Sequence, residues 1–362
     1  MIHEALFSLW NCPGDLFRTI TEEEWLSAIE LEEFLHPGEK QLLKKIMELA
    51  LSYHKIEYFR KMINNQSTIL YQVTASKGNQ DLQLVTRSNI RPGLYVKAFC
   101  DGLDKVLQSY RNTIVEIEDK FLKSPHLTLT YVLGEVQKFD ILFEALLRMI
   151  RMIENENIHG VLLMSRLYLY TICGIPLIVD AANKIIQSVN TIFYRHLCNW
   201  IIYGELVDIH NEFFICDGHC PDENFWYTEQ SSEDIVSGKT EAANTFRRRK
   251  QFQCPIQKFF INTELLPSII SRDTAETILF LGRIVWIVRN DPKKAEDVGY
   301  QLEYKRDIWD GKDVEYYQKI QKLENYPFNL AKFDKTIEEC RQRITQVIST
   351  LYPILYNYIF CF

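Results

Sequence analysis

The stretch that decides the fold runs from Pro176 to Phe214 and reads PLIVDAANKIIQSVNTIFYRHLCNWIIYGELVDIHNEFF. Its apolar residues recur every three to five positions, which keeps them on one broad face of a helix with about 3.6 residues per turn. Those residues are Ile178, Ala182, Ile185, Val189, Ile192, Leu197, Trp200 and Tyr203. Pro176 suits a first helical turn, and Gly204 suits a left-handed cap. We therefore predict a helix over 176–203, roughly 42 Å long, that other helices cover, followed by a short extended tail.

Segments with the same helical spacing occur on both sides of this stretch. They cover 39–63, 94–122, 128–155, 158–171, 273–289, 314–324 and the chain from 333 onward. Between the first two, Ile69–Val73 and Leu82–Val85 flank a polar tip, which fits a hairpin or a mobile insertion. The sequence thus predicts an all-α fold of stacked helical bundles, an elongated, quasi-solenoidal rod with at most a small β-hairpin near 69–85.

Composition and charge narrow the class of protein. Of 362 residues, 47% are hydrophobic and 13% aromatic, so the chain can bury large cores. The formal net charge is −7, and nucleic acid is not an expected partner because phosphate binding needs clustered Lys and Arg. The nine cysteines are scattered singly, and the start lacks the basic region of a signal peptide. We expect a cytosolic protein.

Two patterns resemble ligand sites without completing them. The run 236–240 (VSGKT) is similar to the end of a phosphate-binding loop, but the required glycine is replaced by Glu233, so we interpret it as polar linker. Cys216, His219 and Cys220, with Cys254 and His210 nearby, offer zinc donors, but their spacing matches no paired structural site. We therefore predict no metal, no cofactor and no catalytic residues, and hence no enzyme.

Two further segments leave alternatives open. The basic run Arg247–Lys250 fits a nuclear signal, a contact with an acidic partner, or a solvated loop end. The 19 residues of Ile344–Phe362 are mainly apolar, which fits a tail anchor or a buried helix separated from a partner domain. A membrane tether, with the basic run on anionic lipid, is therefore the alternative to a scaffold.

The N-terminal residues 2–10 form a short amphipathic segment. Its clustered apolar side chains are Leu6, Phe7, Leu9 and Trp10. They suit an interface with a partner, or simple capping of the first bundle, since amphipathic helices usually turn their apolar face inward.

Several stretches, taken in order, resemble one known family. They are FLHP (34–37), GLYVKAFCDGLD (93–104), SPHL (124–127), IHG (158–160), CGIP (173–176), the run Trp200, Gly204, Asp208 and EFFI (212–215), and LPSI (266–269). Together they span nearly the whole chain, and the family they resemble is that of the gamma-tubulin complex components.

The resemblance implies the GRIP-type N-terminal domain, which packs side by side with the same half of a neighbouring component. We accordingly divide the chain into a first bundle (1–155), a second bundle (156–343) with a flexible loop at 217–245, and the start of a truncated C-terminal domain (344–362). In the family, that C-terminal half holds gamma-tubulin, and the assembled ring templates microtubules. The resemblance also implies a cytoskeletal location at microtubule-organising centres, centrosomes or spindle poles. The hairpin-like composition near 69–86 departs from it.

Overall fold

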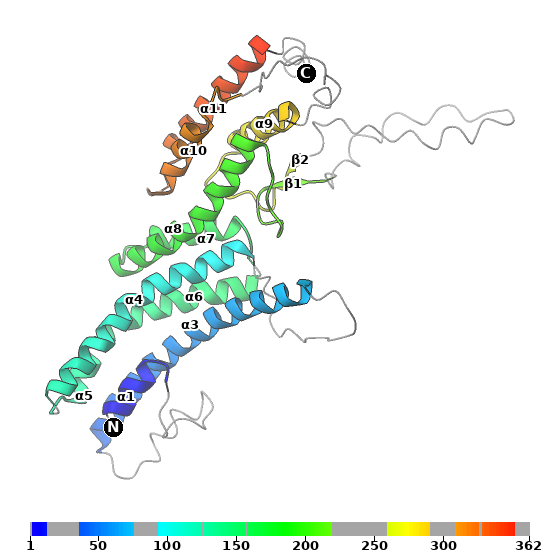
Figure 1. Ribbon diagram of the computed structural model, residues 1–362. Helices are drawn as coiled ribbons and strands as arrows, with labels where there is room; N and C mark the ends of the chain where they lie inside the picture. The colour runs from blue at the N-terminus through cyan, green and yellow to red at the C-terminus, as the bar shows by residue number, and fades with distance from the viewer. Residues whose placement is uncertain are drawn as a thin grey trace, which may run out of the picture. The chain divides into compact units, whose positions relative to one another are not determined.

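The chain divides into two compact units, Met1–Ile192 and Phe193–Phe362. The computed structural model describes residues 2–12, 36–75, 93–124, 126–156, 158–218, 259–289, 308–325 and 328–351. Each unit is described by itself below, with the labels of Figure 1.

Unit 1 is a bundle organised around one long helix, α3 (Pro37–Ala75), which contacts α1, α4, α5 and α6. The other elements are α1 (Ile2–Leu9), α4 (Leu94–Lys123), α5 (Leu129–Val136), the 3-10 turn η1 (Gln137–Phe139), α6 (Asp140–Glu156), α7 (Leu162–Thr171) and most of α8 (Pro176–Cys198). In Figure 1, α1 lies against the first part of α3, and α4 and α6 run alongside α3.

Aromatic rings fill the centre of unit 1, because helical spacing brings them inward from α3, α4 and α6. Tyr110 lies 4.8 Å from Tyr53 and 4.9 Å from Phe143 between ring centroids. Such pairs contribute about 1 kcal/mol each beyond the area they bury. On the other side of α4, Gly102 lets the backbones of α4 and α8 approach, since a Cβ there would lie 2.7 Å from the Cα of Ile185.

Unit 2 combines helices with a small two-stranded sheet. Its elements are the end of α8, the π-helical turn η2 (Asn199–Tyr203), β1 (Ile215–Asp217), β2 (Phe259–Ile261), α9 (Arg272–Arg289), α10 (Asp313–Gln321), the 3-10 turn η6 (Lys322–Asn325) and α11 (Leu330–Leu351). The strands are antiparallel, with Ile215 opposite Ile261. Helix α9 contacts η2, β2 and α11 and so occupies the centre of the unit.

Two buried tryptophans fix the packing of unit 2. The indole N–H of Trp200 donates to the carbonyl of Ile278 at 2.9 Å, and that of Trp309 donates to the carbonyl of Ile202 at 3.1 Å. Trp200 also packs directly against Gly282. A Cβ added at position 282 would lie 1.9 Å from the Trp200 ring. Both rings therefore pack without leaving a buried donor unpaired.

The predicted nearly all-α fold of helical bundles is confirmed, and so is the helix over 176–203. It consists of α8 followed by η2, and Gly204 ends it in the left-handed conformation with φ 65°. The final turn differs from the prediction because it is π-helical, with the Gly204 amide donating to the carbonyls of Asn199 and Trp200. The tail after it, residues 205–214, is irregular with a turn at 209–210, and the strand β1 begins only at Ile215.

The hairpin expected near 69–85 is wrong in its first half. Residues 69–75 continue α3, because extending an existing helix is favourable even where β-branched residues lower its propensity. Residues 76–92 lie outside the described part of the chain, as do 219–245 of the predicted loop and 352–362 of the predicted C-terminal segment. The domain boundaries stay predictions.

Candidate functional site

Helix α1 and the turn that follows it at Trp10 carry the four residues predicted as an interface, and the structure separates them into two pairs. Leu6 and Leu9 are buried, at 5% and 0% exposure, on the side that faces α3 and α4. Phe7 and Trp10 remain 39% and 42% exposed. Leu6 and Leu9 thus cap the bundle, whereas Phe7 and Trp10 are exposed on its surface. The partner interface itself stays a prediction.

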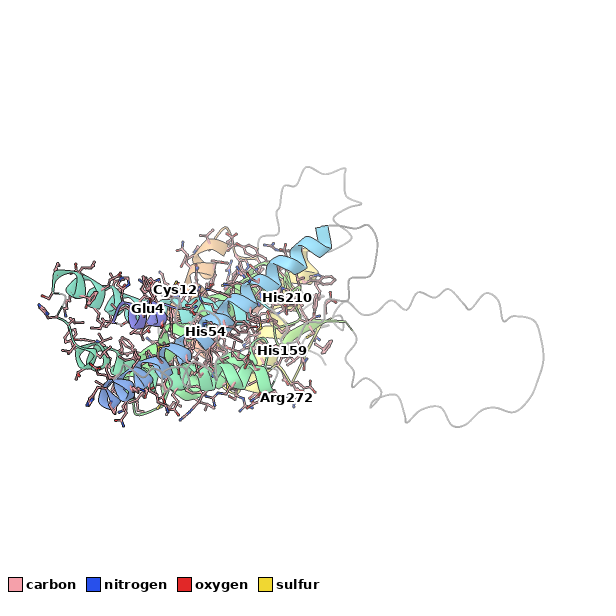
Figure 2. All side chains as sticks on the ribbon, turned by 90° about the horizontal axis from the view of Figure 1, so that it is seen from below. Glu4, Cys12, His54, His159, His210 and Arg272 are labelled. Atoms are coloured by element: carbon pink, nitrogen blue, oxygen red, sulfur yellow. The ribbon has the colours of Figure 1, made fainter. Side chains whose placement is uncertain are left out.

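The end of α1 is tied to both neighbouring helices. The Tyr110 hydroxyl on α4 donates to the Leu9 carbonyl at 2.9 Å in the buried interior. Asn11 takes the left-handed conformation (φ 63°), and its side-chain oxygen meets the ring Nδ1 of His54 on α3. Figure 2 labels His54 on α3 and Glu4 and Cys12 of the α1 segment. The exposed rings of α1 are therefore presented from a fixed helix.

A pocket of about 200 Å³ lies between α1 and α4. Its walls are His3, Leu6, Phe7, Trp10, Ile114, Val115 and Glu118. The His3 ring packs edge-on to Phe7 with centroids 4.4 Å apart, which holds the Phe7 ring at the wall. Most of the lining is apolar, so the site suits an apolar side chain and offers no arrangement for chemistry.

A cluster of charged side chains around the buried Glu57 joins α3 to α4 beside the aromatic core. Glu57 is only 3% exposed, and its two oxygens accept hydrogen bonds from Arg111 at 2.6 Å and from Arg60 at 2.8 Å. Asp104 accepts from the same two guanidiniums, at 2.9 Å and 3.1 Å. The Tyr53 hydroxyl accepts from Arg111 at 3.1 Å. Every member therefore has a partner, as buried charges require.

This cluster sets the ionisation of its members. Burial alone would raise the pKa of Glu57, but the hydrogen bonds from Arg60 and Arg111 outweigh it, and the pKa is lowered. Burial acts to lower the pKa of Arg111, yet its bonds to Tyr53, Glu57 and Asp104 raise it. Glu57 and Arg111 are therefore both charged at neutral pH, and the cluster is a structural clamp.

A second group of buried titratable residues lies in unit 2. Burial lowers the pKa of His196 on α8 to about 4, although the Asp208 carboxylate acts in the opposite direction. Asp208 in turn accepts from the Phe213 amide at 2.7 Å, and the His196 ring packs against the Phe213 ring at 5.6 Å. His196, which is neutral at pH 7, and Asp208 thus hold the turn that leads from η2 into β1.

The other predicted ligand and anchor segments lie mostly outside the described residues. Of the zinc candidates, the structure places Cys216 on β1 and His210 in an exposed turn, and among the described residues no three metal-ligating side chains meet. The VSGKT run and Arg247–Lys250 are not described. Among the residues that the structure describes, no helix is both long and apolar enough to span a membrane.

Sequence reasoning missed the pocket wall on α4 and one exposed apolar turn. Val115 directly follows the buried Ile114 and is 50% exposed. As an apolar residue outside the helical spacing of the buried positions, it could have indicated an apolar surface on α4. The turn between α7 and α8 exposes Ile172 and Ile175, and only Ile175 had been singled out from the sequence, within the family motif CGIP (173–176).

Comparison with known proteins identifies the family. The family model described as "Gamma tubulin complex component N-terminal" matches residues 2–352. The chain is 27% identical over 355 residues to "Gamma-tubulin complex component 4" of Mus musculus, across 96% of this chain and 51% of the relative, and equally to that of Homo sapiens.

A more distant relative is "Spindle pole body component alp6" of Schizosaccharomyces pombe, 24% identical over 73% of this chain and 31% of the relative. The chain spans about half the length of the mammalian relatives that it matches. The matched residues include both compact units and the motifs quoted above. The chain therefore belongs to the gamma-tubulin complex component family and represents its N-terminal domain.

Proposed function

We propose that this chain is the N-terminal half of a non-catalytic structural subunit of the gamma-tubulin ring complex. It associates laterally with neighbouring complex components and so helps to build the template for microtubule nucleation. The observation that carries the proposal is the family match over residues 2–352, supported by relatives whose names are those of complex components.

The packing of both units suits a load-bearing role. A template must hold neighbouring subunits at a fixed spacing, so each subunit has to resist bending. The interlocked rings of unit 1 and the Trp200–Gly282 contact of unit 2 leave little room for repacking, since close-packed interiors transmit strain. Nothing in this role requires a cofactor, nucleic acid or a membrane.

We assign gamma-tubulin binding to the half of the family's chain that this sequence does not cover. The N-terminal half then contributes lateral contacts alone. The names of the relatives, one of them a spindle pole body component, support a location in the cytoplasm at microtubule-organising centres, centrosomes or spindle poles. The alternative of a tail-anchored tether has no support in the described helices.

The lateral contact that we propose uses the exposed side of α1. Phe7 and Trp10 meet the neighbour, while Leu6 and Leu9 hold the helix on its own bundle. Aromatic side chains are the commonest anchors of protein interfaces, because they bury a large area with few rotatable bonds.

Mixing this protein with the N-terminal half of a sister component tests the proposal. We expect a co-migrating complex in size-exclusion chromatography at micromolar concentration, and about tenfold weaker binding for Trp10→Ala. Tyr58→Ala, which removes an aromatic ring that is 64% exposed on α3, is the matched control and leaves binding unchanged. Free monomers under these conditions contradict the function, and equal loss in both variants contradicts the α1 interface. A liposome flotation assay, in which we expect no flotation, separates the scaffold from the tether.

A further inference from the structure

The connection between α4 and α5 contains a motif that has no role in the function proposed above. Ser124 and Pro125 form the only Ser-Pro or Thr-Pro pair among the eleven prolines of the chain. A serine or threonine followed by proline is the minimal sequence that proline-directed protein kinases accept. The chain therefore offers such a kinase a single position, and the surroundings of Ser124 decide whether it can be used.

Ser124 lies where a kinase can reach it. It directly follows the last residue of α4, is exposed, and has an extended backbone with φ −136° and ψ 92°. The residue before a proline is held in this region because the proline ring clashes with a helical predecessor. Protein kinases bind the segment around the modified serine in an extended conformation, so Ser124 already has the backbone form that they require.

The last turn of α4 can open around Ser124 without uncovering the core. Leu122 is 72% exposed, and the side chain of Lys123 is exposed to the same extent. Two backbone bonds close the connection: the Ser124 amide donates to the Lys120 carbonyl at 2.9 Å, and the Ser124 carbonyl accepts from the Leu127 amide at 3.3 Å. Because helix ends open at a low cost in free energy, a kinase can straighten the residues before Ser124.

Two lysines at the end of α4 lie within reach of a phosphate on Ser124. Lys120 lies one helical turn before Ser124, and Lys123 lies directly before it. The Lys120 ammonium donates to the hydroxyl of Tyr131 on α5 at 2.6 Å, and Lys123 pairs with Asp119 at 2.6 Å. In Figure 1, α5 begins beside the end of α4. Both lysine contacts are at the surface, where an ion pair contributes little, so either ammonium can exchange its partner for a phosphate.

These lysines are needed because the C-terminal end of a helix disfavours an anion. The last carbonyl groups of α4 carry partial negative charge, and a phosphoserine carries roughly −1.5 to −2 at pH 7. Without cations nearby, the phosphate would destabilise the last turn. Charge-assisted hydrogen bonds from two ammonium groups offset this repulsion, so the folded chain can hold the modified residue.

We propose that Ser124 is a phosphorylation site for a proline-directed kinase and that Lys120 and Lys123 bind the phosphate. In the reaction, the Ser124 hydroxyl oxygen forms a bond to the γ-phosphorus of ATP, and the bond from that phosphorus to the β–γ bridging oxygen breaks. ADP leaves, and the hydroxyl proton passes to the carboxylate base of the kinase.

The modification would change the charge beside the α1–α4 pocket. Glu118 in the pocket wall lies six residues before Ser124, about 9 Å along α4. That distance is about one Debye length at physiological ionic strength, so the charge of the phosphate reaches the pocket. The site itself does not depend on the lateral association proposed above.

Treatment of the full chain with a cyclin-dependent kinase and Mg·ATP tests the site. We expect one phosphoryl group per chain, located on Ser124 by tandem mass spectrometry, and none on the Ser124→Ala variant. Pro125→Ala keeps the hydroxyl and should lower the initial rate at least about tenfold. Thr130→Ala, at an exposed position on α5, is the matched control and leaves the rate unchanged. Circular dichroism verifies that the variants are folded.

Three outcomes of this experiment overturn the site. They are a folded wild type that takes up no phosphate, a wild type that is modified only after it has been unfolded, and equal rates for the wild type and Pro125→Ala. Whether the chain binds a sister component has no bearing on any of them, so the site and the proposed function can fail separately.

Phosphorus NMR tests the role of the lysines in the phosphorylated protein. Nearby ammonium groups favour the dianion, so the titration midpoint of the phosphate should lie about half a pH unit lower in the wild type than in the double variant Lys120→Gln, Lys123→Gln. Lys138→Gln removes an exposed lysine that pairs with Glu135, and it should leave the midpoint unchanged. Equal midpoints in the wild type and the double variant would show that the two lysines do not bind the phosphate.

Discussion

Two helix contacts, one in each unit, show different ways of fixing a register. In unit 1, α3 meets α4 through Glu57, Arg60, Arg111 and Asp104, so buried charge selects the alignment of the helices. In unit 2, η2 meets α9 through Trp200 and Gly282, and the shape of a ring against a missing side chain selects it.

The difference determines which kind of change destabilises each contact. A cluster of paired charges tolerates small changes of volume but depends on every charge, because an unpaired buried ion is strongly destabilising. A ring on a glycine is insensitive to pH and salt but has no space for one more carbon atom. The α3–α4 contact is therefore the one that responds to protonation, and the η2–α9 contact is the one that responds to volume.

The largest effect is expected for Gly282→Ala. The added Cβ would lie 1.9 Å from the Trp200 ring, and that ring cannot move away without breaking its bond to Ile278. We expect a loss of about 3 kcal/mol in the free energy of unfolding, measured by urea denaturation followed through tryptophan fluorescence. Gly134→Ala on α5 is the matched control, since no heavy atom lies within 4 Å of its Cβ position. Alanine favours a helix there by up to about 1 kcal/mol, and equal stability of the two variants would mean that the Trp200–Gly282 contact does not form.

A smaller loss, about 2 kcal/mol at pH 7, is expected for Glu57→Gln, because Arg60 and Arg111 then lose their buried counter-charge and keep only the partly exposed Asp104. Glu144→Gln is the control: Glu144 pairs with Arg148 on α6 at about 60% exposure, where such pairs contribute about 0.5 kcal/mol or less. Similar losses in both variants would show that the α3–α4 cluster is solvated.

The pH dependence of that loss sharpens the comparison. The folded pKa of Glu57 is lowered, so its stabilising contribution is fully present above the unfolded value of about 4.3 and disappears as the pH falls through the folded value. The difference between wild type and Glu57→Gln should stay constant from pH 7 to about 5 and shrink below about 4. The loss caused by Gly282→Ala should not follow this curve.

Local signals made one of the two contacts predictable in outline. The apolar periodicity, with Pro176 and Gly204 at the ends, identified the helix that carries Trp200. These signals are local, because apolar spacing and capping residues are recognised within a few neighbouring residues. The β-pairing of Ile215 with Ile261 joins segments 46 positions apart in sequence, so no local pattern indicated it. The hairpin was predicted near 69–85 instead, from β-branched composition that the continuing helix α3 overrides.

The candidate site was predictable only in part for a related reason. Clustering marked Leu6, Phe7, Leu9 and Trp10 as one set, but which side chains are covered depends on α3 and α4, which follow much later in the chain. Isoleucine is usually buried, so the residue type predicts burial at Ile172, whereas the side chain is exposed. Glu57 lies between apolar neighbours on the buried face of α3, and its partner Arg111 is 54 residues away.

The smallest effect concerns the bond that ties α1 to unit 1. Tyr110→Phe keeps the ring in the aromatic cluster but leaves the buried Leu9 carbonyl without its 2.9 Å donor, which should cost about 1 kcal/mol. Hydrogen exchange should then rise at the amides of α1 before it rises elsewhere in unit 1, since α1 is short and depends on this anchor. Tyr131→Phe is the control, because the Tyr131 hydroxyl accepts from Lys120 at the surface. This variant should leave the amides of α1 protected from exchange. If α1 exchanges equally in both variants, the rings of Phe7 and Trp10 are held by packing on α3 alone, and the α1–α4 pocket does not depend on the Tyr110 bond.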